Sequence, residues 1–274
     1  MTEITLYNGD CLQVMKDIPD KSIDLIICDL PYGCLTGGGV QKKTRRRFQN
    51  GKNTGTTIKQ STGVIAGCAW DVKINLEEFW KQVKRIRRSD RSPTIHFCTT
   101  KFGFELIKSN PDEFRYDLVW DKQRGVSFLS ANKSPMRCHE MIYVFSKKGA
   151  FYDRKDIAGD FPGAINPKIH KRSTVSNVYP RLDDSLETRK GLRCALSVIK
   201  QTGITKKGNH PTEKPKELYK WLIERYCPEE GTVLDPTAGS FNSVFQAVDM
   251  NRNAIGIEKD EGYYNKALEK YNSL

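Results

Sequence analysis

Apolar and polar positions follow two different periods along this chain. Short apolar runs with an abrupt polar end are typical of strands buried on both faces of a sheet. They predict strands over residues 4–8, 23–28, 93–98, 114–120, 139–145, 232–234 and 253–257. Apolar positions three or four residues apart predict helices that contain residues 12–18, 76–86, 101–108, 218–226, 241–248 and 263–267. This alternation of strands and helices predicts an α/β fold with a mostly parallel sheet and helices on both faces.

The run 23–28, I-D-L-I-I-C, stops at Asp29, Leu30, Pro31 and Tyr32. In open α/β sheets, ligands bind beyond the carboxyl ends of the strands. Asp29 and the main-chain carbonyl of Leu30 or Pro31 can accept hydrogen bonds from an exocyclic amine, while Tyr32 offers a flat face for stacking. This stretch is therefore a candidate site for a planar ring that carries an amino group. The alternative is a strand followed by an ordinary proline-containing turn.

A second strand and turn lie near the C-terminus. The run 232–234 ends in D-P-T-A-G-S at residues 235–240, and the strand after the next helix ends on Glu258. Small residues at a helix N-terminus let the backbone approach a ligand, and an acid at the next strand end can accept hydrogen bonds from ribose hydroxyls. The chain has neither G-x-G-x-x-G nor a Walker A sequence, which argues against dinucleotide binding and NTP hydrolysis. A nucleoside ligand without a pyrophosphate remains, and S-adenosylmethionine fits that description.

Charge is distributed unevenly around a net value of +12. Residues 34–70 carry seven basic and no acidic side chains, and residues 146–210 carry 14 basic and six acidic ones, whereas both ends of the chain are acidic. Basic side chains that neutralise phosphates give affinity for a polyanion, so we expect the central segments to bind nucleic acid; the alternative is a solvated basic surface. The candidate residues for this contact are Lys42, Lys43, Arg45, Arg46, Arg47, Lys171 and Arg172. Their surroundings predict a basic loop insert at about 34–69 and a target-recognition insert at about 150–208.

The eight cysteines form no C-x-x-C pair, which predicts reduced core thiols in an intracellular protein and no metal site. No apolar run approaches the roughly 20 residues that span a bilayer. The first residues, M-T-E-I-T-L-Y, lack the basic and apolar blocks of a signal peptide. We therefore expect a cytoplasmic, nucleoid-associated protein without a membrane contact, compatible with a bacterial, phage or viral origin.

Several segments, in this order, resemble the motifs of the amino-methylating DNA methyltransferases of the permuted, β-type order. G-D-C at 9–11 resembles the family's opening motif, and D-L-P-Y at 29–32 its catalytic D-P-P-Y. H-P-T-E-K-P at 210–215 matches H-P-T-x-K-P, and V-L-D-P-T-A-G-S at 233–240 resembles V-L-D-P-F-A-G-S. G-I-E at 256–258 with Tyr263 and Tyr264 resembles the family's G-I-E and Y-Y, while residues 120–122 and 139–147 resemble its intervening strands. The resemblance does not extend to 34–69 or 150–208.

The resemblance implies a single catalytic domain over residues 1–274, with a Rossmann-like, seven-stranded methyltransferase sheet in circularly permuted motif order. It implies S-adenosylmethionine as cofactor, S-adenosylhomocysteine as product, and DNA as substrate, with a target adenine flipped out of the duplex and methylated at N6. The implied catalytic residues are Asp29, Leu30, Pro31 and Tyr32. The implied cofactor-binding residues are Asp10, Asp29, Thr212, Lys214, Asp235, Pro236, Thr237, Ala238, Gly239, Ser240, Asn242, Glu258 and Lys259.

Three positions depart from the family's pattern. Leu30 replaces the first proline of D-P-P-Y but keeps the main-chain carbonyl. Thr237 replaces a phenylalanine, and Phe241 stands where the family usually has glycine. A bulky side chain at position 241 predicts a narrower methionine pocket or weaker cofactor binding, and a catalytically impaired copy is one alternative.

Other functions compete with adenine methylation. Cytosine-N4 methylation poses the same chemical problem, but the family tends to place serine first in the catalytic motif for cytosine, so Asp29 favours adenine. An RNA substrate, a non-catalytic nucleic-acid-binding subunit with a decayed methyltransferase fold, and a dehydrogenase are the further alternatives. A homodimer and a cognate restriction enzyme are compatible partners besides DNA.

Overall fold

The computed structural model describes residues 2–32, 73–126, 128, 131–155, 194–203 and 213–273 with their side chains. It also describes the backbone of six two-residue strands, β3 (Thr44–Arg45), β4 (Phe48–Gln49), β5 (Lys52–Asn53), β6 (Ile58–Lys59), β10 (Ile157–Ala158) and β11 (Leu192–Arg193). These short strands pair in antiparallel fashion as β3 with β6, β4 with β5, and β10 with β11.

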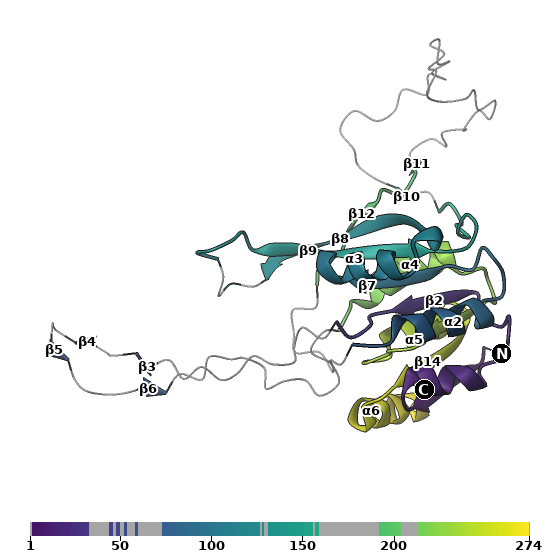
Figure 1. Ribbon diagram of the computed structural model, residues 1–274, viewed down its shortest axis with the longest axis horizontal. Coiled ribbons are helices and arrows are strands. Elements are labelled where there is room, and N and C mark those ends of the chain that lie inside the picture. Colours follow the sequence, from purple (N-terminus) through teal and green to yellow (C-terminus); the bar gives the residue numbers. More distant parts are fainter. Residues whose placement is uncertain are drawn as a thin grey trace, which may run out of the picture.

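Within these residues, one sheet of eight strands organises the fold (Figure 1). Its order is β1-β14-β13-β2-β7-β9-β8-β12, and β9 is antiparallel to both of its neighbours while the other pairs are parallel. The strands are β1 (Ile4–Asn8), β2 (Leu25–Cys28), β7 (Thr94–Cys98), β8 (Phe114–Val126), β9 (Arg137–Phe145), β12 (Val198–Lys200), β13 (Thr232–Asp235) and β14 (Asn253–Glu258). The predicted mostly parallel α/β fold is confirmed.

The helices lie at the predicted places. They are α1 (Cys11–Val14), α2 (Leu76–Ile86), α3 (Thr100–Ser109), α4 (Lys216–Tyr226), α5 (Asn242–Asp249) and α6 (Glu261–Asn272), with 3-10 turns at Met15–Asp17 and Pro111–Glu113. Side chains cap several of them; the Oδ1 of Asn75, for example, accepts from the backbone N–H groups of Glu77 and Glu78 at the start of α2.

Two details differ from the sequence-based expectation. The sheet has eight strands rather than seven, because β12 adds an edge strand alongside β8. Its three residues lie in the segment 150–208, where short strands leave too weak a period to be recognised. The second detail is the hairpin of β8 and β9, which is longer than predicted and extends beyond the rest of the sheet in Figure 1.

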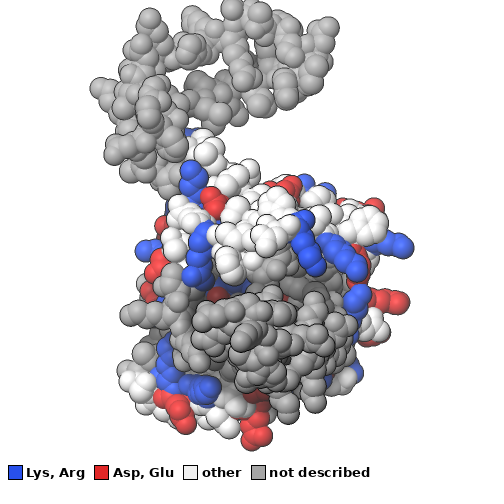
Figure 2. Space-filling model, turned by 90° about the vertical axis from the view of Figure 1, so that its left-hand side faces the viewer, with Lys and Arg blue, Asp and Glu red and all other residues white. Residues whose placement is uncertain are grey.

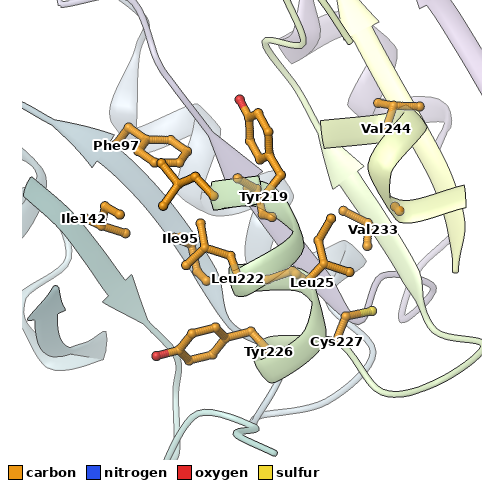
Figure 3. Close-up of a cluster of buried hydrophobic side chains, with 14 of the residues drawn as sticks. Leu25, Ile95, Phe97, Ile142, Tyr219, Leu222, Tyr226, Cys227, Val233 and Val244 are labelled. Atoms are coloured by element: carbon orange, nitrogen blue, oxygen red, sulfur yellow. The ribbon is translucent and has the colours of Figure 1, made fainter. Parts of the chain in front are cut away.

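The core lies on both faces of the sheet. Alternate side chains of β2 explain its continuous apolar run, since Leu25 and Ile27 belong to one buried cluster and Ile26 and Cys28 to the other. Figure 3 shows part of the first cluster, in which side chains of α4 such as Leu222 pack beside strand residues such as Ile95. Helices α4, α5 and α6 contribute to this cluster, and α1, α2 and α3 to the second. Burial on both faces holds β2 rigidly and so fixes the position at which its polar end leaves the sheet.

The six cysteines among the described residues are all free. Four of them, Cys11, Cys28, Cys98 and Cys227, are buried, as expected for core thiols. Cys138 and Cys194 are exposed, so the core expectation is wrong for these two, which lie on β9 and beside the edge strand β12. None of the helices in the described ranges combines the length and the apolar character that a bilayer crossing requires.

Candidate active site

Four carboxylates follow one another along a single edge of the sheet. Asp10 comes after β1, Glu258 ends β14, Asp235 ends β13, and Asp29 comes after β2, which is also the order of these strands in the sheet. Parallel neighbouring strands lie about 4.8 Å apart, so their carboxyl ends bring these side chains together. The predicted cofactor and catalytic segments therefore meet at this edge.

Asp29 has a different partner on each carboxylate oxygen. Its Oδ1 accepts a hydrogen bond from the hydroxyl of Tyr32 at 2.6 Å, and its Oδ2 accepts one from the Nζ of Lys214 at 2.5 Å. The Asp29 side chain retains 22% exposure. Leu30 directs its side chain into the core and is fully buried, so its main chain is what it can offer to a ligand. Pro31 is half-buried.

Tyr32 is held from two sides. Its hydroxyl also donates to the carbonyl oxygen of Phe97 at 3.0 Å, and its ring lies 4.8 Å from the ring of Phe102 at an angle of 34°. Burial, followed by the charge of Asp29, raises the pKa of Tyr32 well above its ordinary value, so the hydroxyl keeps its proton as a donor. In this state the hydroxyl is what contacts Asp29, and the ring packs beside the core.

Lys214 connects Asp29 to two further strands. Its side chain is 5% exposed, and its Nζ lies 3.4 Å from the Oε1 of Glu140 on β9 in addition to its contact with Asp29. Glu140 in turn is paired through its Oε2 with the Nζ of Lys122 on β8, at 2.8 Å. Burial disfavours the charged form of Lys214, but Asp29 and Glu140 outweigh it and raise the pKa of this lysine. The result is a chain of alternating charges, Lys122, Glu140, Lys214 and Asp29, which we call the charge chain.

Asp235 has no cation on either oxygen among the described residues. Its Oδ1 accepts from the backbone N–H of Thr237 at 3.0 Å and its Oδ2 accepts from the hydroxyl of Ser243. Its side chain is 2% exposed. Burial raises the pKa of Asp235 to about 7, since the charges of Asp29 and Glu258 add to the effect and the two hydrogen bonds offset only part of it. Asp235 therefore holds its own turn in place.

Glu258 links the same turn to β14. Its Oε2 accepts from the N–H of Gly239 at 2.8 Å and its Oε1 from the N–H of Asp260 at 2.8 Å. Gly239 has a φ of +52°, a left-handed conformation that glycine adopts without strain. Each carboxylate oxygen can accept two hydrogen bonds, so Glu258 keeps capacity for a ligand hydroxyl. Pro236 and Ala238 are buried in this turn, and Ser240 is half-buried.

Phe241 does not narrow a ligand site in the way that the sequence predicts. It is fully buried, and its ring fills the space beside Gly256, where an added Cβ would lie 2.7 Å from the ring. Phe241 has a φ of +57°, which explains why a glycine would suit this position. The expectation of a bulky side chain in the methionine pocket is therefore wrong, because the ring belongs to the core under α5.

Asn242 and Asp10 anchor segments of the edge. The side-chain amide of Asn242 donates to the Oε1 of Glu213 at 2.7 Å and to the carbonyl of Lys214 at 3.2 Å, which fastens the residues before α4 to α5. Asp10 caps α1 through the N–H of Leu12 at 3.0 Å, and its Oδ2 pairs with Lys259 at 3.1 Å. Asp10 and Lys259 lie at the β1 end of this edge, where their side chains are 44% and 69% exposed.

The residues of the edge fit the adenosyl and methionine parts of the expected cofactor. The Oγ1 of Thr237 is buried without a hydrogen-bond partner in the described structure, and a ligand group would satisfy it. Glu258 also has spare acceptor capacity for a ligand hydroxyl. Among the described residues, no group of three or more His, Cys, Asp or Glu side chains could hold a metal ion.

Some predicted residues fall outside the described part of the chain. Thr212 does so, as do the side chains of the predicted nucleic-acid-binding residues Lys42, Lys43, Arg45, Arg46, Arg47, Lys171 and Arg172. Conversely, Lys122 and Glu140 lie in the segments 120–122 and 139–147 that resemble the family's strands, but the sequence assigns neither of them a role in the site. The antiparallel register that sets Glu140 opposite Trp120 is a tertiary feature.

Comparison with known proteins identifies the family of the chain. The family model "DNA methylase", for N6 and N4 methyltransferases, matches residues 23–269. The chain is similar to the DNA adenine methyltransferase YhdJ of Escherichia coli K12, with 40% identity over 276 residues, which covers 97% of this chain and 82% of the relative. It is also similar to the Type II methyltransferase M.HindIII of Haemophilus influenzae, with 25% identity over 300 residues, 97% of this chain and 94% of the relative.

Solved structures share the fold. The complex of M1.HpyAVI with SAM superposes with a TM-score of 0.57 at 16% identity, covering 98% of this chain and 99% of that one. The cytosine-N4-specific PvuII DNA methyltransferase superposes with a TM-score of 0.60 at 15% identity, covering 99% and 87%. At this level of identity the likeness establishes the architecture of the sheet and its helices.

Proposed function

Because the chain belongs to the N6/N4 DNA methylase family, which matches residues 23–269, we propose that it methylates the N6 amine of adenine in DNA. The observation that carries the proposal is the position of Asp29, at the end of a fully buried strand and beside the turn formed by residues 235–240. The methyl donor is S-adenosylmethionine, whose positive sulfur makes its methyl group electrophilic, so that no covalent enzyme intermediate is needed.

The roles of the residues follow from their hydrogen-bonding capacity. Asp29 accepts from the N6–H of the target base through Oδ1, with the main-chain carbonyls of Leu30 and Pro31 as further acceptors. Orientation of the amine lone pair in this way lowers the barrier through positioning and electrostatics. Tyr32 gives up its hydrogen bond to Asp29 when the base arrives and stacks its ring on the base. Glu258 holds the ribose hydroxyls, and the turn with Thr237 and Gly239 holds the methionine part.

The choice of adenine rests on two observations. Asp29 stands first in the catalytic motif, where the resemblance places serine for cytosine. The relative that shares 40% of its residues with this chain is named a DNA adenine methyltransferase. The cytosine-specific structural neighbour shares only the fold, at 15% identity, and gives no information about the target base of this chain.

DNA is the proposed polyanion. The target base cannot be reached inside the duplex, so it is flipped out at a cost of a few kcal/mol of stacking. Figure 2 looks onto the side from which the β8–β9 hairpin extends, and Lys and Arg side chains lie at several places around the described surface there. The basic inserts at about 34–69 and 150–208 would supply further phosphate and base contacts to this single catalytic domain.

Mass spectrometry of nucleosides from DNA incubated with the protein and S-adenosylmethionine tests the proposal. We expect N6-methyladenine, and its loss by at least about a thousandfold in Asp29→Ala, because the acceptor for the amine is removed. Asp90→Ala, which alters a partly exposed aspartate paired with Lys147, is the matched control and should retain full turnover. N4-methylcytosine as product, or retained turnover in Asp29→Ala, would contradict the assignment.

A further inference from the structure

The charge chain brings together residues that are far apart in the sequence. Lys214 and Asp29 are separated by 185 positions, and Glu140 and Lys122 lie on the two strands of the β8–β9 hairpin. Its two end members, Lys122 and Asp29, have 21% and 22% of their side chains exposed, and Lys214 between them is the least accessible at 5%. The charge chain therefore links the β8–β9 hairpin to the catalytic carboxylate through a buried ammonium.

A buried ammonium needs compensation by carboxylates. Removal of an ammonium from water costs several kcal/mol, and one ion pair of good geometry does not always repay it. Lys214 meets two carboxylates, and its Nζ also lies 5.1 Å from the centre of the Phe97 ring, where a cation–π contact adds to its stabilisation. Glu140 is thus the group that lets Lys214 remain in this position without relying on Asp29 alone.

We propose that Glu140 is a positioning residue that anchors Lys214. Lys214 in turn holds the Oδ2 of Asp29. The Oδ1 of Asp29 can then exchange its hydrogen bond with Tyr32 for one with the substrate amine. This inference rests on the proposed function for its catalytic consequence and on the geometry alone for the anchoring. Lys122 steadies Glu140 from the far end through the 2.8 Å pair. Tyr32 and Lys214 contact different oxygens of Asp29, so a displacement of Lys214 would also displace the carboxylate.

A double-mutant cycle on Glu140 and Lys214 tests whether Glu140 acts through the lysine. We expect Glu140→Gln to lower kcat for methyl transfer about tenfold with an unchanged KM for DNA, since it disturbs geometry rather than binding. In a Lys214→Met background the same Glu140→Gln substitution should not lower the residual kcat further. Equal effects in both backgrounds would overturn the proposal.

The same double-mutant cycle can be measured by the midpoint of urea unfolding, which does not depend on methyl transfer. Glu140→Gln should lower the urea midpoint of the otherwise native protein, because Lys214 loses a partner. In the Lys214→Met background it should lower the midpoint much less, because only the pair of Glu140 with Lys122 is then left to lose. An equal fall of the midpoint in both backgrounds would overturn the anchoring. Should the wild type transfer no methyl group to DNA, the proposed function fails, while this cycle still decides the anchoring.

The matched control is Glu105→Gln, which removes the acid of an exposed ion pair with Lys73. It should change neither kcat nor the midpoint appreciably in either background. If Glu140→Gln does not fold, Lys122→Gln weakens the charge chain from its hairpin end and should lower kcat about threefold with KM unchanged. An unchanged kcat in that variant would overturn the proposal.

Discussion

Asp29 and Asp235 occupy equivalent places on neighbouring strands but differ in chemistry. Each stands at the end of a buried strand, β2 or β13, and these strands pair in parallel. Asp29 is bound by an ammonium and a phenol hydroxyl and keeps 22% exposure. Asp235 is bound by a serine hydroxyl and a backbone N–H of its own turn and is 2% exposed.

The difference shows that a carboxylate at a strand end is not by itself a catalytic group. Asp29 is paired with Lys214, and Lys214 is also paired with Glu140. One oxygen of Asp29 can therefore accept a hydrogen bond from a substrate. Asp235 is enclosed without a cation among the described residues, and burial raises its pKa to about 7. Its hydrogen bonds stabilise the turn that the ligand is expected to contact. Each prediction below changes one side of this contrast.

The largest effect should come from the titration of Asp235. Its folded-state pKa of about 7 lies above the ordinary value of 3.8, so between these pH values the folded state binds a proton that the unfolded state lacks. Stability should therefore fall as pH rises through this window, by about 1.4 kcal/mol per pH unit. Asp235→Asn cannot titrate, so urea unfolding from pH 4 to 7 should show the wild type losing stability relative to the variant. Parallel curves for the two proteins would refute the assignment of this proton.

Removal of the ammonium beside Asp29 should have the next largest effect. Lys214→Met leaves Asp29 and Glu140 without their shared partner, and loss of one member of a buried pair costs about 3 kcal/mol. Urea unfolding at neutral pH measures this loss. Lys259→Met is the control, because Lys259 is 69% exposed in its pair with Asp10 and should change stability by less than about 0.5 kcal/mol. A similar cost for both lysines would remove the distinction.

Phe241→Gly should destabilise the turn on the Asp235 side. Glycine relieves the left-handed backbone at position 241, which is worth about 1–2 kcal/mol. Loss of the fully buried ring costs about 3–5 kcal/mol, so packing outweighs strain. We expect a net loss of about 2 kcal/mol by thermal or chemical unfolding. A more stable variant would mean that the backbone strain, rather than the ring against Gly256, dominates at this position.

The smallest effect should follow from Tyr32→Phe. This change keeps the ring but removes the hydrogen bonds to Asp29 and to the carbonyl of Phe97, for a loss of about 1 kcal/mol of stability. Since the proposed role of Tyr32 in the reaction lies in its ring, kcat/KM should fall less than tenfold, whereas Tyr32→Ala should fall well beyond that. Steady-state kinetics on one DNA substrate compare the two variants. Equal losses would assign the function to the hydroxyl instead.

Much of the fold and part of the site follow from local pattern. The apolar run before Asp29 and the small-residue turn after β13 were recognisable because strand ends and turns depend on neighbouring residues. The roles of Glu140 and Lys122 do not follow from local pattern, because they depend on the register of two antiparallel strands. The sequence predicts the wrong role for Phe241, because a positive φ and a core position beside Gly256 are not visible in it.

The sequence by itself determined which segments form strands and helices, and that acids stand where the strands end. These features depend on the periodicity of side chains and on the short-range conformational preferences of the backbone. The tertiary structure decided which of these acids is paired with Lys214 and which is buried without a cation. The physical reason is that the energy of a charge depends on its distance from other charges and from water, and both are set by residues far away in the chain.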